Sequence, residues 1–293
     1  MFRDYLKLHF IVILAGFTAI LGDLITLGGA ALVFWRTLVA GAVLIVFLTF
    51  KKTGPRPSLR DRSLLFANGL LIGLHWYLFF HAVKIANVSV CMVGMATVAL
   101  WTSILEPLIL QRRRPSLYEV ALGLVMIAAI AFLFGSGSPF KAGLAVAVGS
   151  ALAATLFAIF NGFFTNKHHF LVITSHEMAG ACVFNAGAFL VFDHLAGGTL
   201  TFLPTLADTG WLLVLSLACT VYAFSQYVEL LRRLSVFTIN LSFNLEPVYG
   251  ITLAALIFGE HHQLTAQFYI ASAVILAAVL SYPFAQRRAS RVG

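Results

Sequence analysis

Long apolar stretches alternate with short polar connections along the whole chain. Stretches of about 18 to 25 residues recur, which is the length that an α-helix needs to cross a hydrocarbon core of about 30 Å. None of the connections is long enough to hold a separate soluble domain. The pattern predicts an all-α integral membrane protein with ten transmembrane helices, at residues 8–24, 30–50, 64–83, 87–110, 117–134, 142–165, 170–192, 209–230, 235–257 and 266–284.

Composition supports the same class. Of the 293 residues, 60% are hydrophobic and 10% are charged, whereas soluble domains carry roughly 25% charge. The net charge of +8 does not indicate nucleic-acid binding, because the basic residues form short clusters between apolar stretches. The three cysteines lie inside apolar stretches and show no metal-ligand spacing, so we expect no disulfide framework, no metal and no cofactor.

The connections between spans differ in positive charge, which distinguishes a cytoplasmic side from an outer side. With the N-terminus in the cytoplasm, only Lys84 and Lys141 fall outside, and Arg36 lies within the second span. Because a missed or invented span would scramble this alternation, the positive-inside rule predicts ten spans with both termini cytoplasmic. The remaining lysines and arginines all fall inside: Arg3, Lys7, Lys51, Lys52, Arg56, Arg60, Arg62, Arg112, Arg113, Arg114, Lys167, Arg232, Arg233, Arg287, Arg288 and Arg291.

The two halves of the chain match weakly when one is moved along the other by 148 residues. Lys84 then meets Arg232, and Val88 meets Val236. Lys84 is predicted outside and Arg232 inside, so the two halves have opposite orientations. We therefore predict an inverted repeat, with residues 1–138 as the first five-helix unit and residues 139–293 as the second. Inverted repeats of this kind are the usual basis of alternating access.

Several motifs resemble the EamA family of the drug/metabolite transporter (DMT) superfamily. They are the G-F-T-A-I-L-G run at Gly16–Gly22, Arg36, the N-L-E-P-V-Y-G run ending at Gly250 and the L-I-F-G-E run ending at Glu260. The resemblance covers nearly the whole chain. It implies a membrane exporter of small molecules such as amino acids, drugs or nucleotide sugars, with spans 1, 3 and 4 lining a midplane cavity.

The sequence departs from that family at two positions. Ala15 stands where members often carry tryptophan before Gly16, and Ala99 stands where members carry proline in the fourth span. The polar residues of spans 6, 8 and 9, described below, place these three spans at the same cavity. Spans 5 and 10 are expected at the periphery.

Motifs for other chemistry are missing from the sequence. It contains no H-E-x-x-H, no G-x-S-x-G, no pair of aspartate-rich motifs and no Walker-type phosphate loop. We therefore expect no enzyme, but a secondary transporter in the cell inner membrane that moves amino acids or similar metabolites by alternating access. Export would proceed by proton exchange or by facilitated diffusion. The alternative is a non-transporting membrane protein, either a lipid-acting enzyme or an assembly scaffold.

The expected partners follow from this interpretation. They are a small-molecule substrate, the lipid bilayer and protons, and no nucleic acid. The protein is expected to be a monomer or a homodimer.

The eighth span carries the clearest polar stripe. Tyr222, Ser225, Gln226 and Glu229 lie at i, i+3, i+4 and i+7, so they share one helix face. The stripe predicts a cavity lining, with Tyr222 and Gln226 as substrate-binding candidates; hydrogen bonding between helices is the alternative. Asn161 lies on a weaker stripe in the sixth span and is a further candidate.

The ninth span combines a carboxylate with a helix breaker. Asn240 and Asn244 share one face and are substrate-binding candidates, whereas Glu246 projects to nearly the opposite side. Pro247 removes one backbone hydrogen bond, so it is a candidate pivot for a gate. Glu246 is either a proton carrier or a structural acceptor at the kink. The corresponding register of the fourth span, Val98-Ala99, has no proline, which predicts a kink in the second half only.

Two charges lie inside spans. Arg36 and Glu177 each stand about six residues into the second span of their half. Burial of either charge demands a partner. The pair is interpreted as two gates, one at each mouth, with snorkelling to the interface as the alternative.

Aromatic residues supply the remaining substrate-binding candidates. His75 and Trp76 lie in the middle of the third span, and Trp101 lies in the fourth. Each has a structural alternative: His75 as a hydrogen-bond donor between helices, and the two tryptophans as packing residues.

Overall fold

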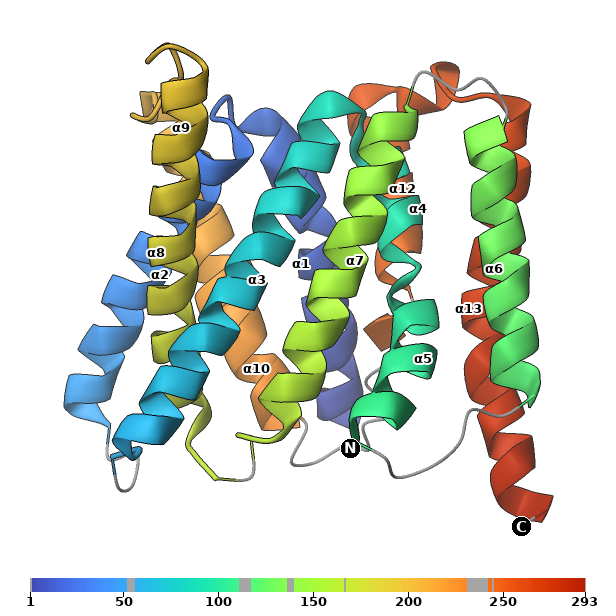
Figure 1. Ribbon diagram of the computed structural model, residues 1–293, viewed down its shortest axis with the longest axis horizontal. Coiled ribbons are helices and arrows are strands. Elements are labelled where there is room, and N and C mark those ends of the chain that lie inside the picture. Colours follow the sequence, from blue (N-terminus) through green and yellow to red (C-terminus); the bar gives the residue numbers. More distant parts are fainter. Residues whose placement is uncertain are drawn as a thin grey trace.

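The computed structural model describes residues 2–51, 56–110, 117–135, 140–165, 167–230, 242–243 and 245–292. Every regular element in these ranges is helical (Figure 1). The two ends of the chain lie at the same end of the bundle. The elements are α1 (Phe2–Leu24), α2 (Gly29–Phe50), α3 (Leu59–Ile85), α4 (Val88–Met95), α5 (Val98–Leu110), α6 (Leu117–Gly135), α7 (Lys141–Gly162), α8 (Phe170–Leu195), α9 (Leu206–Ser216), the π-helix η1 (Leu217–Tyr222), α10 (Ala223–Leu230), α12 (Glu246–Phe258), the 3₁₀-helix η2 (Glu260–His262) and α13 (Ala266–Val292).

Six of the described helical segments are long and apolar enough to cross a membrane. They are Arg3–Leu24, Gly29–Phe50, Leu59–Ile85, Val88–Ile109, Lys141–Gly162 and Phe170–Leu195. The segments 206–222, 246–258 and 266–278 are shorter apolar helices. The chain is therefore an all-helical membrane protein. The predicted ninth span, 235–257, lies partly outside the described residues.

Two of the predicted spans contain breaks. The fourth span consists of α4 and α5, which Ala96 and Thr97 separate as a turn. The Thr97 hydroxyl donates to the Gly94 carbonyl at 2.6 Å, and the Thr97 amide donates to the same oxygen at 3.1 Å. In the ninth span, Leu245 precedes the first residue of α12, and Pro247 lies in its first turn. Proline fits there because the first helical N–H groups have no partner within the helix.

The two half-helices have similar lengths and regularly spaced starting points. α5 begins at Val98 and α12 begins at Glu246, 148 positions later, and both are 13 residues long. The prediction of a kink in the second half only is therefore wrong. The first half breaks at the matching position without proline, because Thr97 supplies hydrogen bonds that end α4. Pro247 lies in the first turn of α12.

Small residues bring the backbones of neighbouring helices together. Gly69 of α3 and Gly180 of α8 face each other, and a Cβ atom on Gly180 would overlap the Phe66 carbonyl oxygen. Gly16 of α1 lies against Gly250 of α12 in the same way. In membranes, where helix association has little hydrophobic drive, such close packing holds helices together.

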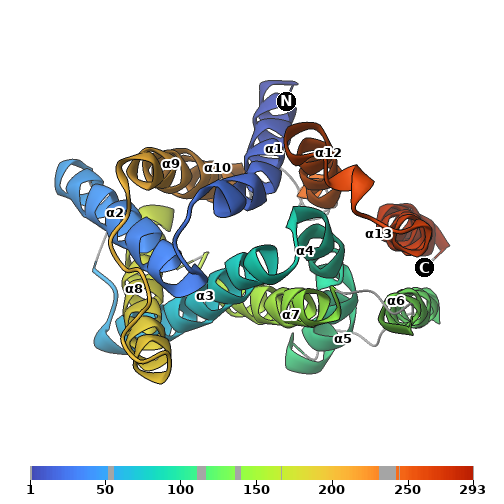
Figure 2. The same cartoon turned by 90° about the horizontal axis from the view of Figure 1, so that it is seen from above.

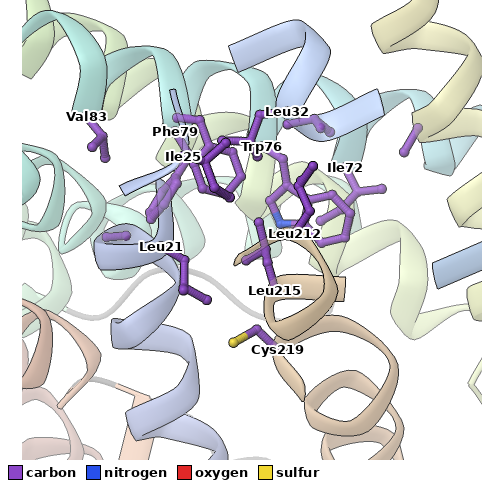
Figure 3. Packing of buried hydrophobic residues seen from close by; sticks show 14 of the residues in the cluster. Leu21, Ile25, Leu32, Ile72, Trp76, Phe79, Val83, Leu212, Leu215 and Cys219 are labelled. Carbon is purple, nitrogen blue, oxygen red and sulfur yellow. The ribbon is translucent and has the colours of Figure 1, made fainter. Parts of the chain in front are cut away.

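α3 lies in the middle of the bundle. α7 and α8 pack on either side of it, while α1, α9 and α10 form the facing row (Figure 2). The largest apolar cluster fills the space between the rows with Leu21 and Ile25 of α1, Trp76 of α3, Leu212 of α9 and Cys219 of η1 (Figure 3). α3 therefore touches both halves of the chain.

Candidate functional site

Polar side chains are buried at two levels along α3. α3 begins at the end of the bundle that holds both termini (Figure 1), and Asn68 precedes His75 and Trp76 along it. At 1.5 Å per residue, Asn68 and Trp76 are separated by about 12 Å along the axis. Each level meets a charged residue from another helix.

Arg36 of α2 occupies the level of Trp76. Its guanidinium carbon lies 3.9 Å from the centroid of the Trp76 ring, a cation–π contact. Its Nε donates to the Thr220 hydroxyl at 2.7 Å, while Nη1 finds no acceptor among the described residues. Only 3% of Arg36 is exposed. The side chain is therefore held inside the bundle and does not snorkel out of it.

Glu177 of α8 occupies the level of Asn68. The Asn68 amide nitrogen donates to Glu177 Oε1 at 2.9 Å. Neither Glu177 Oε2 nor Asn68 Oδ1 has a hydrogen-bond partner among the described residues, and both side chains are buried. Arg36 is the eighth residue of α2 and Glu177 the eighth of α8, so the two charges hold matching places in their helices.

The partner of Arg36 lies on the π-helix η1. The Thr220 hydroxyl donates to the Leu215 carbonyl, five residues earlier, at 2.9 Å while it accepts from Arg36. Short π-helical turns inside α-helices are frequent at functional sites. The irregular turn places an acceptor where a buried cation needs one.

His75 joins α3 to α7. Its Nδ1 lies 2.8 Å from the Ser150 hydroxyl, which itself donates to the His75 carbonyl at 2.8 Å. This contact is the structural alternative to substrate binding. Trp76 is buried under Arg36 and packs in the core.

Asn161 and Trp101 each leave a buried polar atom unsatisfied. Asn161 is buried in α7, and its Oδ1 has no partner among the described residues. The indole nitrogen of the half-buried Trp101 also has none. Both atoms are shielded from solvent, and neither residue lines the cavity described below.

The stripe on the eighth span is divided among different surroundings. Gln226 accepts a hydrogen bond from Lys7 Nζ at 3.2 Å, which joins α10 to α1. Tyr222 is 39% exposed and meets the Phe10 ring edge-on. Glu229 is half-buried, whereas the burial of Ser225 lies outside what the structure describes.

The ninth-span candidates are only partly described. Asn240 and Asn244 lie outside the described residues. Glu246 is half-buried in the first turn of α12, where the positive end of the helix dipole favours a carboxylate. Pro247 is buried beside it.

Two carboxylates that the sequence did not single out join the halves of the chain. Glu260 accepts from the backbone N–H groups of Val88 at 2.9 Å and Ser89 at 2.8 Å, at the start of α4. Asp208 accepts from the amide of Thr26 at 2.7 Å and from its hydroxyl at 2.8 Å. Both contacts lie at the end of the bundle opposite the termini. The only hint in the sequence was the position of Glu260 at the end of the L-I-F-G-E run.

A cavity of about 510 Å³ lies between α3 and the end of α7. Asn68 contributes to its lining, together with Leu64, Phe160, Phe164, Arg60 and Lys167. Among the described residues no group of three or more metal-ligating side chains exists.

Comparison with known proteins identifies the first half. Residues 5–135 match the model of the EamA-like transporter family. These residues belong to that family. The resemblance inferred from the motifs is thereby confirmed over these residues, which contain Arg36, Asn68, His75 and Trp76.

A solved structure described as "Crystal structure of protein" shares the fold. It is 18% identical, has a TM-score of 0.64, and the match covers 96% of this chain and 97% of that one. A search of curated proteins finds no match to this chain. The fold of this chain therefore recurs over nearly its full length in that structure.

Proposed function

We propose that the protein is a secondary transporter of the drug/metabolite type that moves small metabolites, such as amino acids, across the cell inner membrane. The observation that carries this proposal is the EamA-like match over residues 5–135. A transporter needs no catalytic constellation, which agrees with the non-enzymatic character of the family.

The proposed mechanism is alternating access between two inverted five-helix repeats, residues 1–138 and 139–293. The matching bounds of α5 and α12 support this, because half-helices at corresponding places in two repeats mark the centre of many secondary transporters. In this mechanism Pro247 is a pivot for one gate. Arg36 and Glu177, at matching places in α2 and α8, would each control one mouth.

We propose export, driven by proton exchange or by facilitated diffusion. Glu246 and Glu177 are the carboxylates inside the bundle that would carry a proton. Carboxylates within membrane spans commonly form proton relays in transporters.

Release of solutes from liposomes tests the proposal. Purified protein is reconstituted, loaded with a mixed pool of labelled amino acids and metabolites, and compared with protein-free liposomes. Accelerated release of at least one solute is expected. Failure to accelerate any solute would favour the alternative of a lipid-acting enzyme or an assembly scaffold.

Coupling is tested on a transported solute. A pH gradient should change its flux, and the Glu246→Gln variant should abolish that change. If the pH gradient changes the flux through neither the wild type nor the variant, proton exchange is contradicted and facilitated diffusion is supported.

A further inference from the structure

The cavity of about 510 Å³ is a groove on the outer face of the bundle. On α3 its lining includes Ala67, nine residues before Trp76. At about 100° per residue, these two side chains point to opposite sides of the helix. Trp76 belongs to the central cluster, with residues of α1, α9 and η1 (Figure 3). Ala67 therefore faces away from the interior, and it is exposed, as are Leu64 and Phe160 of the lining.

The floor of the groove is closed by contacts to α8. Phe164, which lines the groove, packs with Leu65 of α3 and Ile173 of α8 in a buried cluster. Asn68, which also lines it, donates from its amide nitrogen to Glu177 of α8. The described lining comes from α3, α7 and the connection after α7, and includes no residue of α1, α9, α10 or α12. The groove therefore opens toward the surroundings of the bundle and not toward the space between its two rows of helices (Figure 2).

The length of the groove fits one leaflet of a bilayer. Its lining follows α3 from Arg60, in the first turn of the helix, to Leu71. At 1.5 Å per residue this is about 16 Å, roughly half of a hydrocarbon core of about 30 Å. α3 begins at the end of the bundle that holds both termini (Figure 1), which the positive-inside rule predicts to be cytoplasmic. The groove therefore spans the depth of the leaflet on that side.

Two cations stand at the mouth of the groove. Arg60 at the start of α3 and Lys167 after the end of α7 both line it, and both are exposed. Asp61, the acidic residue of the described lining, lies 3.0 Å from Nε2 of His168. Its carboxylate therefore has a partner that is neither of the two cations. A guanidinium can hold a phosphate by two parallel hydrogen bonds, and a lysine adds a point charge, so the mouth suits a phosphate group.

Below the mouth the walls of the groove are apolar. Leu64 and Leu71 of α3 lie on one side, and Phe160 and Phe163 lie on the other. Leu64 is 45% exposed and Phe163 is 44% exposed, so large apolar side chains remain open to a ligand in the groove. A hydrocarbon chain covers such side chains without burying any polar group. Positive charge at the interface followed by apolar walls matches the order of groups in an anionic phospholipid.

We propose that this groove binds an anionic glycerophospholipid, with its phosphate between Arg60 and Lys167 and an acyl chain along Leu64, Ala67 and Phe160. Basic pockets between transmembrane helices on the cytoplasmic side are known to bind anionic headgroups. A second copy of this chain fits the groove less well, because a twofold contact would place two pairs of like charges in one interface. The proposal does not depend on transport, because the groove lies outside the space between the two rows of helices.

Native mass spectrometry of the full-length protein, released from non-ionic detergent, tests the site. The probes are phosphatidylglycerol and phosphatidylcholine with the same acyl chains, which differ in the charge of the headgroup. Phosphatidylglycerol should be retained in preference to phosphatidylcholine. Arg60→Gln combined with Lys167→Gln should weaken phosphatidylglycerol by about 25-fold, since one basic residue beside an anionic lipid contributes about 1 kcal/mol, a factor of about five. Retention of phosphatidylcholine should not change.

Matched variants test the charge and the apolar wall separately. Arg3→Gln combined with Lys51→Gln removes the same charge from exposed side chains at the same end of the bundle, outside the described lining, and should leave retention unchanged. Ala67→Phe fills the apolar part of the groove without touching either cation, and should weaken phosphatidylglycerol several-fold. Ser63→Phe adds the same ring one turn earlier on α3, at an exposed position outside the described lining, and should have no effect. Because every changed side chain is exposed, none of these variants alters the packed core.

Three kinds of result would overturn the proposal. Equal retention of the two lipids, or an equal loss in the double variant of Arg3 and Lys51, would show that the cations of the groove do not select the lipid. Displacement of phosphatidylglycerol by glycerol phosphate at the same concentration, or full retention in Ala67→Phe, would show an anion site that holds no acyl chain. A dimer of the wild type that disappears in Ala67→Phe would make the groove an interface between copies of the chain instead.

Discussion

The hydrogen bonds between Glu260 and the start of α4 predict a loss of stability when the carboxylate is replaced. Gly259 ends α12 with φ +65°, a left-handed conformation that glycine adopts without strain, and this turn directs Glu260 toward α4. The Glu260 carboxylate then accepts from the N–H groups of Val88 and Ser89, which belong to the other half of the chain. Glu260→Gln keeps the shape of the side chain and removes one acceptor and the charge.

The magnitude follows from the two contacts. The single amide oxygen of glutamine can accept from one N–H group, while its NH₂ group faces the other donor. The lost charged hydrogen bond is worth about 1.5–3 kcal/mol, and the lost charge at a helix N-terminus about 0.3–1 kcal/mol more. We expect a destabilisation of about 2–4 kcal/mol. At about 2–4 °C per kcal/mol for a large chain, the melting temperature should fall by about 5–15 °C.

The assay combines thermal melting with hydrogen–deuterium exchange. Faster exchange is expected both at Val88 and Ser89 and in the segment 259–263, because the two halves lose a shared contact. Asn87→Ala is the matched control. Asn87 caps the same helix by accepting from the Val90 N–H at 2.8 Å, but within one half. Its loss should cost about 0.5–2 kcal/mol and leave exchange at 259–263 unchanged.

Two results would refute this reasoning. One is a Glu260→Gln protein that melts and exchanges like the wild type, which would mean that the carboxylate contributes nothing across the halves. The other is equal loosening of 259–263 in Asn87→Ala, which would mean that fraying of α4, rather than the shared contact, controls that segment.

Three further changes test the packing and the polar contacts. Gly180→Leu should destabilise by about 1–3 kcal/mol, since its side chain would overlap Phe66 and Gly69; Gly187→Leu, with open space on the same helix, should melt like the wild type. Thr220→Val should cost about 1–3 kcal/mol by removing the acceptor of Arg36, whereas Thr220→Ser should retain stability. Asp208→Asn should weaken the second link between the halves, and its effect on melting should add to that of Glu260→Gln within about 0.5 kcal/mol; a clear departure from additivity would show that the two links are coupled.

Hydropathy located the helices but not their interruptions. The predicted spans 30–50 and 170–192 correspond to Gly29–Phe50 and Phe170–Leu195, because apolar length alone marks such helices. The breaks at Thr97 and in η1 escaped prediction. They depend on whether a threonine hydroxyl bonds to a nearby carbonyl, which does not change the hydrophobic pattern.

The partners of the buried charges also escaped prediction. The sequence indicated that Arg36 and Glu177 needed partners, and charged ones would have been the natural guess. The structure supplies neutral ones, Thr220 and Asn68, which lie 184 and 109 residues away in the chain. Asn68 within an apolar span, next to Gly69, was the one signal available. Spacing along a single helix cannot show which neutral side chain of another helix will meet a charge.

The two charge contacts are counterparts in the repeat interpretation. Arg36 on the second span of the first half bonds to the eighth span, and Glu177 on the second span of the second half bonds to the third. If the two halves are exchanged, each contact takes the place of the other. The charged partner, however, is positive in one contact and negative in the other. Each charge is also left with an unsatisfied atom, Nη1 on Arg36 and Oε2 on Glu177. The two unsatisfied atoms are opposite in kind, a hydrogen-bond donor on Arg36 and an acceptor on Glu177.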